Sequence, residues 1–184
     1  MGNADLRPDS EISAVIQEIK TVLDSARANV AREVNSELLN SYWNIGRIIC
    51  EYEQSAPERA DYGKQTLKVL AKELTNTFGK GFSVSNIQFM RRFYQTYQIQ
   101  QTVSVKLSWS HYCELLSISD PDKRSFYEKE AINANWSVRE LKRQVDSSLF
   151  ERLLLSKGEV NKEQVLALAL HGNELAKPAD VIRD

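Results

Sequence analysis

The stretch from residue 9 to residue 45 contains neither glycine nor proline, and this feature constrains the fold more than any other. Asp9 and Ser10 are good N-cap residues for a helix that begins here. Apolar or small residues then recur with the helical period of about 3.6, at Ile12, Val15, Ile19, Val22, Ala26, Val30, Val34, Leu38, Tyr42, Ile45, Ile49 and Tyr52. The pattern predicts either one helix of about forty residues or two helices that break near Asn40 or Gly46.

An apolar stripe of this length often needs a partner surface, so homodimerisation through the first helix is one interpretation. The alternative is a long helix that packs within its own domain. A chain of 184 residues with 42% hydrophobic residues is long enough for one large domain or two small ones with a buried core. Seven glycines and four prolines are few for this length, which favours helix throughout. We therefore expect an all-α protein.

The charge and cysteine content exclude several classes of protein. With 24 Lys and Arg against 25 Asp and Glu, the chain has no overall positive field, so binding to nucleic acid would need a local patch. Cys50 and Cys113 lie far apart and outside any Cys-x-x-Cys pattern, which predicts neither a disulfide framework nor a zinc site and favours the cytoplasm. No apolar run approaches the roughly 18 residues that span a bilayer, and residues 1–10 do not resemble a signal sequence. No cofactor and no small-molecule substrate is indicated.

A helix-turn-helix is predicted over about residues 62–97. Its first helix should run from about Tyr62 to Thr77, with an inner face of Leu67, Leu70, Ala71 and Leu74. The glycines of Phe78-Gly79-Lys80-Gly81 permit a tight turn. The next helix should begin at Ser83 as N-cap, where Phe82 and Ile87 have the spacing of a hydrophobic staple. Helix, short glycine turn and capped helix are together typical of the helix-turn-helix motif.

The helix after Ser83 separates into two faces when its residues are placed at 100° intervals. The inner face should contain Val84, Ile87, Met90, Phe93, Tyr94 and Tyr97. The outer face has Ser85, Gln88, Arg92 and Gln95, with Arg91 beside them and no carboxylate. Such a row is typical of a major-groove helix, because Arg can pair with guanine, Gln with adenine, and Ser with phosphate or base.

The surroundings of this helix have a positive bias. No Asp or Glu occurs between Glu73 and Glu114, while Lys80, Arg91, Arg92 and Lys106 fall inside that span. We therefore predict a DNA-binding surface that consists of Lys80, Ser83, Ser85, Gln88, Arg91, Arg92, Gln95 and Lys106. The alternative is an ordinary solvated helix face in a helical bundle.

The segment after this helix breaks the helical pattern. Val103, Val105 and Leu107 alternate with polar residues, so residues 100–107 form either a connector or a short strand that could act as a wing. Ser108 can cap a helix that runs to about Ile118. His111 near its start has no nucleophile or acidic partner at a recognisable spacing, which indicates a capping or packing role.

Two more helix starts are well specified. Asp120 as N-cap and Pro121 at the first helical position predict a helix to about Ala134, with Phe126, Tyr127, Ala131 and Ile132 partly inward. Ser137-Val138-Arg139-Glu140 is a capping box, and Trp136 and Leu141 repeat the staple seen at Phe82, which suggests two related helix-turn-helix halves.

The end of the chain has a buried stripe and then a linker. Leu141, Val145, Leu149 and Leu153 form the stripe, and Arg139 and Arg143 share a face with Asp146 that we interpret as a local salt-bridged surface. Residues 156–184 read as a helix over about 162–170 followed by a linker that includes His171.

Five blocks of sequence resemble a known family in order and spacing. They are Arg59-Ala60-Asp61-Tyr62-Gly63-Lys64-Gln65, Phe78-Gly79-Lys80-Gly81-Phe82-Ser83, Leu107-Ser108-Trp109-Ser110-His111-Tyr112, Phe126-Tyr127-Glu128-Lys129-Glu130-Ala131 and Trp136-Ser137-Val138-Arg139-Glu140-Leu141. Over about residues 12–155 the chain thus resembles the N-terminal domain of the YhcG-like family of bacterial proteins. The resemblance implies a helix-turn-helix-like DNA-binding domain over residues 1–155, with residues 156–184 leading to a PD-(D/E)XK nuclease domain that this chain lacks.

No catalytic residue of such a nuclease has a matching position here. A PD-(D/E)XK centre needs its Pro-Asp and its downstream (Asp/Glu)-x-Lys on adjacent strands, where they hold a divalent ion and activate water. Pro121-Asp122 with Glu128 or Glu130 supplies pieces of the pattern, but Asp120-Pro121 begins a helix. We therefore expect no metal site and a non-catalytic domain that either binds DNA for a tethered nuclease or serves dimerisation or partner binding through its first helix.

Overall fold

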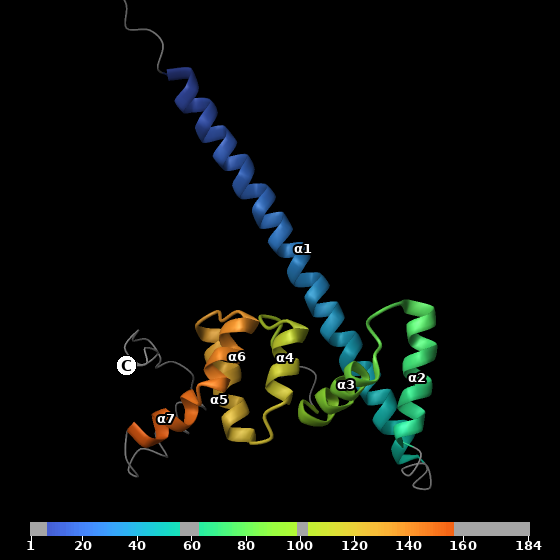
Figure 1. Ribbon diagram of the computed structural model, residues 1–184. Helices are drawn as coiled ribbons and strands as arrows, with labels where there is room; N and C mark the ends of the chain where they lie inside the picture. The colour runs from blue at the N-terminus through green and yellow to red at the C-terminus, as the bar shows by residue number, and fades with distance from the viewer. Residues whose placement is uncertain (1–6, 56–62, 99–102, 157–184) are drawn as a thin grey trace, which may run out of the picture.

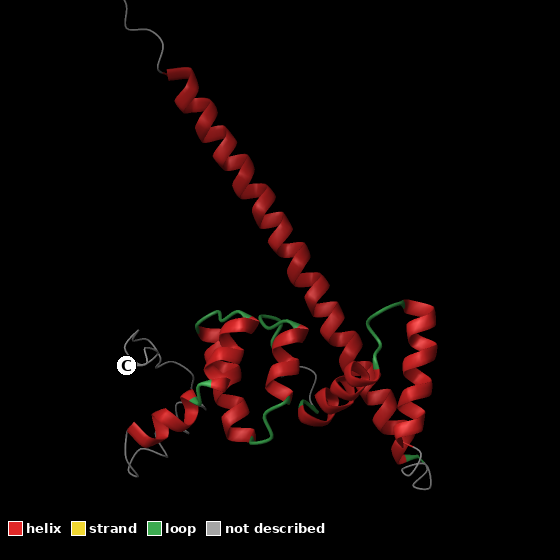
Figure 2. Ribbon diagram, viewed as in Figure 1, coloured by secondary structure: helices red, strands yellow, loops and turns green. Residues whose placement is uncertain are grey.

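A computed structural model describes residues 7–55, 63–98 and 103–156 of the chain. Within these ranges the chain folds into seven helices and no strand, which confirms the predicted all-α class (Figures 1 and 2). The helices are α1 (Arg7–Gln54), α2 (Gly63–Phe78), α3 (Val84–Thr96), α4 (Trp109–Leu116), α5 (Pro121–Asn133), α6 (Val138–Asp146) and α7 (Leu149–Ser156).

The first helix is a single helix of 48 residues. It breaks neither at Asn40 nor at Gly46, so of the two predictions for this stretch, one long helix is confirmed and two shorter helices are wrong. Only its C-terminal part enters the folded body, where Leu39, Trp43, Ile49 and Cys50 are buried. Its N-terminal half projects away from the other helices (Figure 1).

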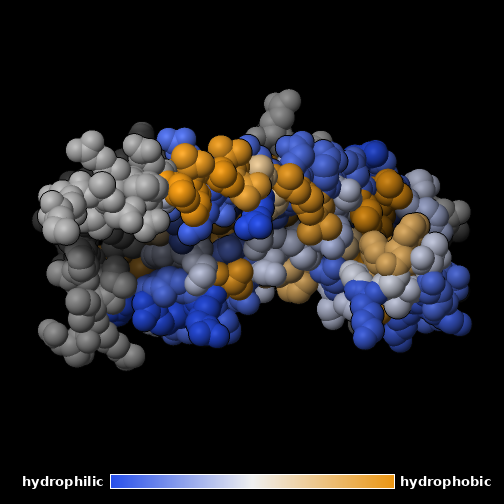
Figure 3. Space-filling model, turned by 90° about the horizontal axis from the view of Figure 1, so that it is seen from above, coloured by the Kyte–Doolittle hydropathy of each residue, from blue (hydrophilic) through white to orange (hydrophobic). Residues whose placement is uncertain are grey.

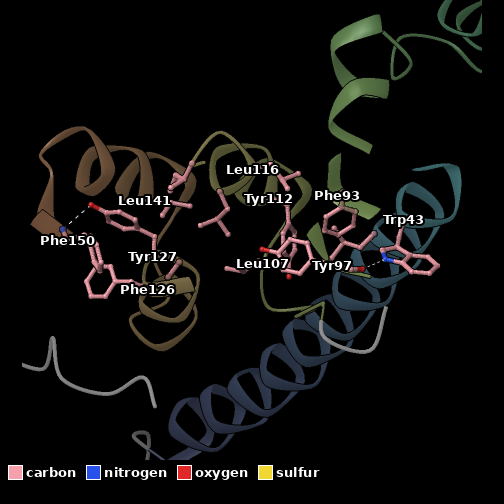
Figure 4. Close-up of a cluster of buried hydrophobic side chains, with 14 of the residues drawn as sticks. Trp43, Phe93, Tyr97, Leu107, Tyr112, Leu116, Phe126, Tyr127, Leu141 and Phe150 are labelled. Carbon is pink, nitrogen blue, oxygen red and sulfur yellow. Dashed lines mark hydrogen bonds between the residues drawn. The ribbon is translucent and has the colours of Figure 1, made fainter. Parts of the chain in front are cut away.

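The main core lies between α1 and the helices that follow it. Aromatic rings dominate its centre, where the ring centroid of Phe93 in α3 lies 4.9 Å from that of Tyr112 and 5.3 Å from that of Tyr97 (Figure 4). The ring centroid of Trp109 also lies 5.3 Å from that of Phe93. The indole nitrogen of Trp43 donates a hydrogen bond of 2.6 Å to the carbonyl oxygen of Tyr97, so α1 is fixed to the end of α3.

A smaller core joins α2 to α1 and α3. It contains the buried side chains of Ile49, Leu67, Ala71 and Ile87. Leu70 and Leu74 pack against it and are half-buried, so the predicted inner face of this helix is confirmed. The predicted inner face of α3 is also confirmed, with Ile87, Met90, Phe93 and Tyr97 buried and Val84 and Tyr94 half-buried.

Residues 103–107 form a turn rather than a strand, so this part of the chain forms no wing. The Tyr112 hydroxyl accepts the Ser104 N–H at 2.8 Å and donates to the Ser104 carbonyl at 3.0 Å. The Asn35 side chain donates to the carbonyls of Val105 and Leu107 at 3.0 and 2.9 Å. Because side chains already satisfy these backbone groups, the segment is a fixed connector between α3 and α4.

The helix starts predicted at Asp120 and Ser137 are both confirmed. The Asp120 carboxylate accepts the backbone N–H groups of Asp122 and Lys123, and the Ser137 hydroxyl accepts that of Glu140 at 3.2 Å. The predicted buried stripe from Leu141 to Leu153 is shared by two helices, because Ser148 has φ of 53° and ends the run of α6 before α7 begins.

Tyr127 holds this break in place. Its hydroxyl donates to the Gln144 carbonyl at 3.1 Å and accepts the Phe150 N–H at 3.2 Å (Figure 4). The salt-bridged surface predicted on α6 exists, with partners other than those expected: Asp146 pairs with Lys142 and Arg143 pairs with Glu140.

The helix predicted over 162–170 and the linker with His171 lie outside the described residues. Among the helices that are described, none combines the length and the apolar character that crossing a membrane requires.

Candidate nucleic-acid interface

The predicted helix, glycine turn and capped helix are present as α2, residues 79–83 and α3. Gly79 has φ of +89°, a backbone conformation that glycine adopts without strain, and its N–H donates to the Thr75 carbonyl. The Ser83 hydroxyl accepts the Asn86 N–H at 3.2 Å and so caps α3. The Asn86 side chain donates to the carbonyl of Gly81, which fixes the turn against the first residues of α3.

The outer face of α3 is open to solvent. Ser85, Gln88, Arg92 and Gln95 are exposed, and Arg91 is half-buried. Ser85 and Gln88 have no side-chain partner among the described residues, whereas Gln95 lies beside the thiol of Cys50. The N-terminal half of the row is therefore the part whose polar groups are free to bind a ligand.

Arg91 is engaged within the protein. Its Nε lies 2.7 Å from Oε2 of Glu53, a residue of α1 that is 38 positions away in sequence. The acid-free span between Glu73 and Glu114 is therefore not acid-free in space, because α1 brings a carboxylate to this face.

Arg92 is engaged as well. One guanidinium nitrogen donates to the Leu116 carbonyl at 3.0 Å, at the C-terminal end of α4, and the guanidinium lies 5.8 Å from the ring centre of Phe89. Positive charge at a helix C-terminus is favourable because the last carbonyls have no partner within the helix. Arg92 thus stabilises the packing of α3 against α4.

A shallow hollow of about 580 Å³ lies at the N-terminus of α3. It brings together three of the predicted residues, Lys80, Ser83 and Ser85, beside Asn86 and Phe89. The first backbone N–H groups of a helix have no partner within it, and they add a partial positive charge to such a site. With the ammonium of Lys80, this end of α3 can hold an anion such as a phosphate.

Cys113 also lines the hollow, but its thiol is not activated. Burial, with a smaller contribution from the carboxylate of Glu114, raises the pKa of this thiol to about 11. A neutral thiol is a poor nucleophile, so the hollow is better suited to binding than to chemistry.

Lys106 does not line this hollow. It is exposed on the connector between α3 and α4, where its backbone N–H donates to the Ser104 hydroxyl at 3.3 Å. The connector is tied to α1 through Asn35, so Lys106 has a fixed backbone and a free side chain.

Two exposed lysines on α2 add to the positive charge of this segment. Lys68 and Lys72 are exposed on α2, one turn apart. Their spacing of four residues places both lysines on one face of the helix and could have identified them in the sequence. In addition, residues 63–98 contain six Lys and Arg against the single carboxylate of Glu73. In helix-turn-helix proteins the helix before the recognition helix contacts the phosphate backbone, so lysines on α2 are suitably placed on the motif.

His111 is a capping residue, as predicted. Its Nδ1 accepts the backbone N–H of Ser108 at 3.2 Å and lies 2.8 Å from the Ser108 hydroxyl, while its Nε2 lies 2.9 Å from the carbonyl of Trp136. Since a carbonyl can only accept, we infer the tautomer with hydrogen on Nε2. The ring therefore joins the start of α4 to the turn before α6.

The pieces of the PD-(D/E)XK pattern lie on α5 and do not form a metal site. Asp122 is in its first turn, Glu128 accepts a hydrogen bond of 2.8 Å from the Tyr97 hydroxyl, and Glu130 is buried. Across the described ranges, no three His, Cys, Asp or Glu side chains come together as a metal-binding group.

Comparison with known proteins gives a family for most of the chain. Residues 18–152 match the family described as DUF1016 N-terminal domain. A relative from Escherichia coli (strain K12), named "Putative nuclease YhcG", is 38% identical over 167 residues, an alignment that covers 73% of this chain and 44% of the relative. The chain therefore spans less than half the length of that relative. No solved structure matches the chain significantly.

Proposed function

This chain belongs to the DUF1016 N-terminal domain family, and we propose that it is the non-catalytic DNA-docking domain of a longer nuclease. In this proposal residues 1–155 bind DNA, and residues 156–184 lead to a PD-(D/E)XK domain that performs the hydrolysis. The free thiols of Cys50 and Cys113 are consistent with a cytoplasmic protein.

One observation carries the proposal: the exposed polar row of α3 begins at a basic hollow within a segment that is almost free of carboxylates. Ser85 and Gln88 are exposed and unpartnered on α3, and Lys80 lies beside them in the hollow. A helix that offers hydrogen-bonding groups without carboxylates is suited to the floor of the major groove.

Each part of the motif has a separate task in this docking. Lys80 and the first N–H groups of α3 hold a phosphate, and Lys68 and Lys72 hold the backbone beside it. Ser85 and Gln88 then face the base edges, where a glutamine can pair with adenine. Arg91 and Arg92 support the motif from within through Glu53 and the end of α4.

The test is a fluorescence-anisotropy titration of the whole chain with labelled duplex, branched and single-stranded DNA at several salt concentrations. The test variant is Lys68→Gln/Lys72→Gln/Lys80→Gln. The control is Lys129→Gln/Arg139→Gln/Lys142→Gln on α5 and α6, which removes the same charge from another surface. We expect the slope of log affinity against log salt to fall by roughly 0.9 for each lost phosphate contact in the test variant only.

Equal losses in the two variants would mean that general charge, rather than this motif, attracts the DNA. No binding of any DNA at low salt would overturn the proposal. Arg91 and Arg92 are unsuitable for this test because their loss also disturbs the packing of α3.

The exposed apolar face of α1 favours a second role in assembly, in which this helix binds another protein chain.

A further inference from the structure

The N-terminal half of α1 has no neighbour in the described structure. Every residue from 12 to 34 is exposed, and the helix leaves the folded body as a straight arm (Figure 1). An isolated helix of this kind is only marginally stable in water unless a packed apolar face supports it.

This arm nevertheless presents nine large hydrophobic side chains to solvent. They are Ile12, Val15, Ile16, Ile19, Val22, Leu23, Val30, Val34 and Leu38, with exposed fractions from 39% to 67%. Seen from above, hydrophobic residues form an interrupted orange row on the molecule (Figure 3). Scattered apolar residues are normal on a surface, but this many along one helix mark an interaction site.

The apolar residues follow a heptad pattern. Six of them, at alternating spacings of four and three, form a seam: Ile12, Ile16, Ile19, Leu23, Ala26 and Val30. Val15 and Val22 widen the seam along one edge, while Lys20 and Arg27 line the other edge. Such a face is that of a helix that packs against another helix of similar pattern.

We propose that this face is covered by the same face of a second copy of the chain, with the two arms antiparallel. The seven large hydrophobic side chains from Ile12 to Val30 offer on the order of 600 Å² on each copy, the lower end of the area that one partner buries in a standard-size interface. A helix that buries this area against its own copy forms a closed pair and covers the apolar seam from Ile12 to Val30.

The antiparallel direction follows from the residues that continue the seam. Glu33 and Glu37 occupy its next two positions, and a parallel pair would place each carboxylate against its own copy. An antiparallel pair centred at Thr21 moves Glu33 away from its own copy, to the level of Asp9 in the first turn of the other arm, where the unpaired N–H groups at the start of that helix favour negative charge.

With the pair centred at Thr21, each seam residue of one arm also faces a seam residue of the other. This register places Ile12 opposite Val30 of the second copy, Ile16 opposite Ala26, and Ile19 opposite Leu23. The large side chain of Ile16 thus faces the small side chain of Ala26. On the valine edge Val22 meets its own copy, and on the other edge the long stems of the two Lys20 side chains can turn their ammonium groups to water.

The pairing also sets the distance between the two bodies. At 1.5 Å per residue the arm from Thr21 to Gly46, where α3 crosses, is about 38 Å long, so the two α3 helices lie roughly 75 Å apart. This is close to two turns of B-DNA at about 34–36 Å per turn, a consequence that also rests on the proposed function.

The test measures the mass of the whole chain by sedimentation velocity over a wide range of concentrations, without DNA. The seam variant is Ile16→Glu/Leu23→Glu, and the control is Ala14→Glu/Ala28→Glu, which adds the same charge on the opposite face of the arm. We expect a dimer for the unaltered chain and the control, and self-association weaker by roughly tenfold or more for the seam variant. Circular dichroism during heating should show that the body still folds, since the core contains neither altered residue.

The direction is tested by disulfide formation in a Cys50→Ser/Cys113→Ser background. A mixture of Ile12→Cys and Val30→Cys chains should cross-link under mild oxidation, while either variant alone should not. Cross-linking of each variant with itself would show a parallel pair and overturn the direction. A monomer at all concentrations, or a dimer that the seam variant does not weaken, would overturn the proposal whether or not the chain binds DNA.

Discussion

Gly46 of α1 lies in contact with the backbone of Met90 in α3. A Cβ atom at position 46 would lie 2.1 Å from the Met90 carbonyl oxygen, 2.8 Å from its carbonyl carbon and 3.0 Å from Cβ of Tyr94. No real contact is that short, so only glycine lets these helices cross at this distance. The close crossing places the inner face of α3 on the core and leaves its opposite face to solvent.

We expect Gly46→Ala to lower the free energy of unfolding by about 2 kcal/mol, because overpacking in a core costs typically 1–3 kcal/mol. The gain of about 1 kcal/mol that alanine brings to a helix acts in the opposite direction and is included in this figure. Urea denaturation followed by circular dichroism measures the change. Gly81→Ala is the control, since nothing lies within 4 Å of a Cβ atom there, and its midpoint should stay close to that of the unaltered chain.

We expect His111→Ala to destabilise the fold by about 1–2 kcal/mol, because the half-buried Trp136 carbonyl and the Ser108 N–H both lose a partner. Ser110→Ala, one residue earlier on the exposed side of α4, is the control and should have little effect. Equal stability of the two variants in urea would show that His111 is dispensable as a cap.

The local structure could be predicted from the sequence because helix ends are determined by neighbouring residues. Ser83, Asp120 and Ser137 each cap a helix with a side chain that bonds to a backbone group two or three residues ahead. The periodicity of apolar residues likewise predicted which face of α3 is buried.

The neighbours of each face could not be predicted, because they come from distant parts of the chain. Periodicity shows that α1 has an apolar stripe, but not that only the part from Leu39 onward meets the core. Arg91 pairs with a residue of α1, and Arg92 donates to the C-terminal end of α4. The helical period places both residues on the outer face of α3, but it does not show which distant residues bind their guanidinium groups.

The ion pair between Arg91 and Glu53 should be measurable as a coupling energy. Both side chains keep some exposure, 38% for Arg91 and 20% for Glu53, so we expect about 0.5–1 kcal/mol of coupling rather than the larger value of a buried pair. Urea denaturation of Arg91→Ala, Glu53→Ala and the double variant gives this quantity as the departure from additivity. Strict additivity would mean that the two groups do not stabilise the contact between α1 and α3.

Two glutamates should change the stability of the protein with pH in opposite directions. Burial raises the pKa of Glu130, which is 5% exposed, so the folded protein favours its protonated form. The stability that this carboxyl group contributes is therefore present at acidic pH, below its ordinary pKa of 4.5, and is lost as the pH rises through its value in the folded state. At neutral pH the buried carboxylate costs stability, and Glu130→Gln should raise the urea midpoint there but not at low pH.

Glu140 is the matched control on the surface. Hydrogen bonds from the Gln144 side chain and from Arg143 lower its pKa, so its contribution is present above its ordinary pKa and is lost as the pH falls through the folded-state value. Glu140→Gln should therefore lower the urea midpoint at neutral pH and have less effect in acid. If both variants shifted the midpoint in the same direction at neutral pH, the burial of Glu130 would not be the cause of its effect.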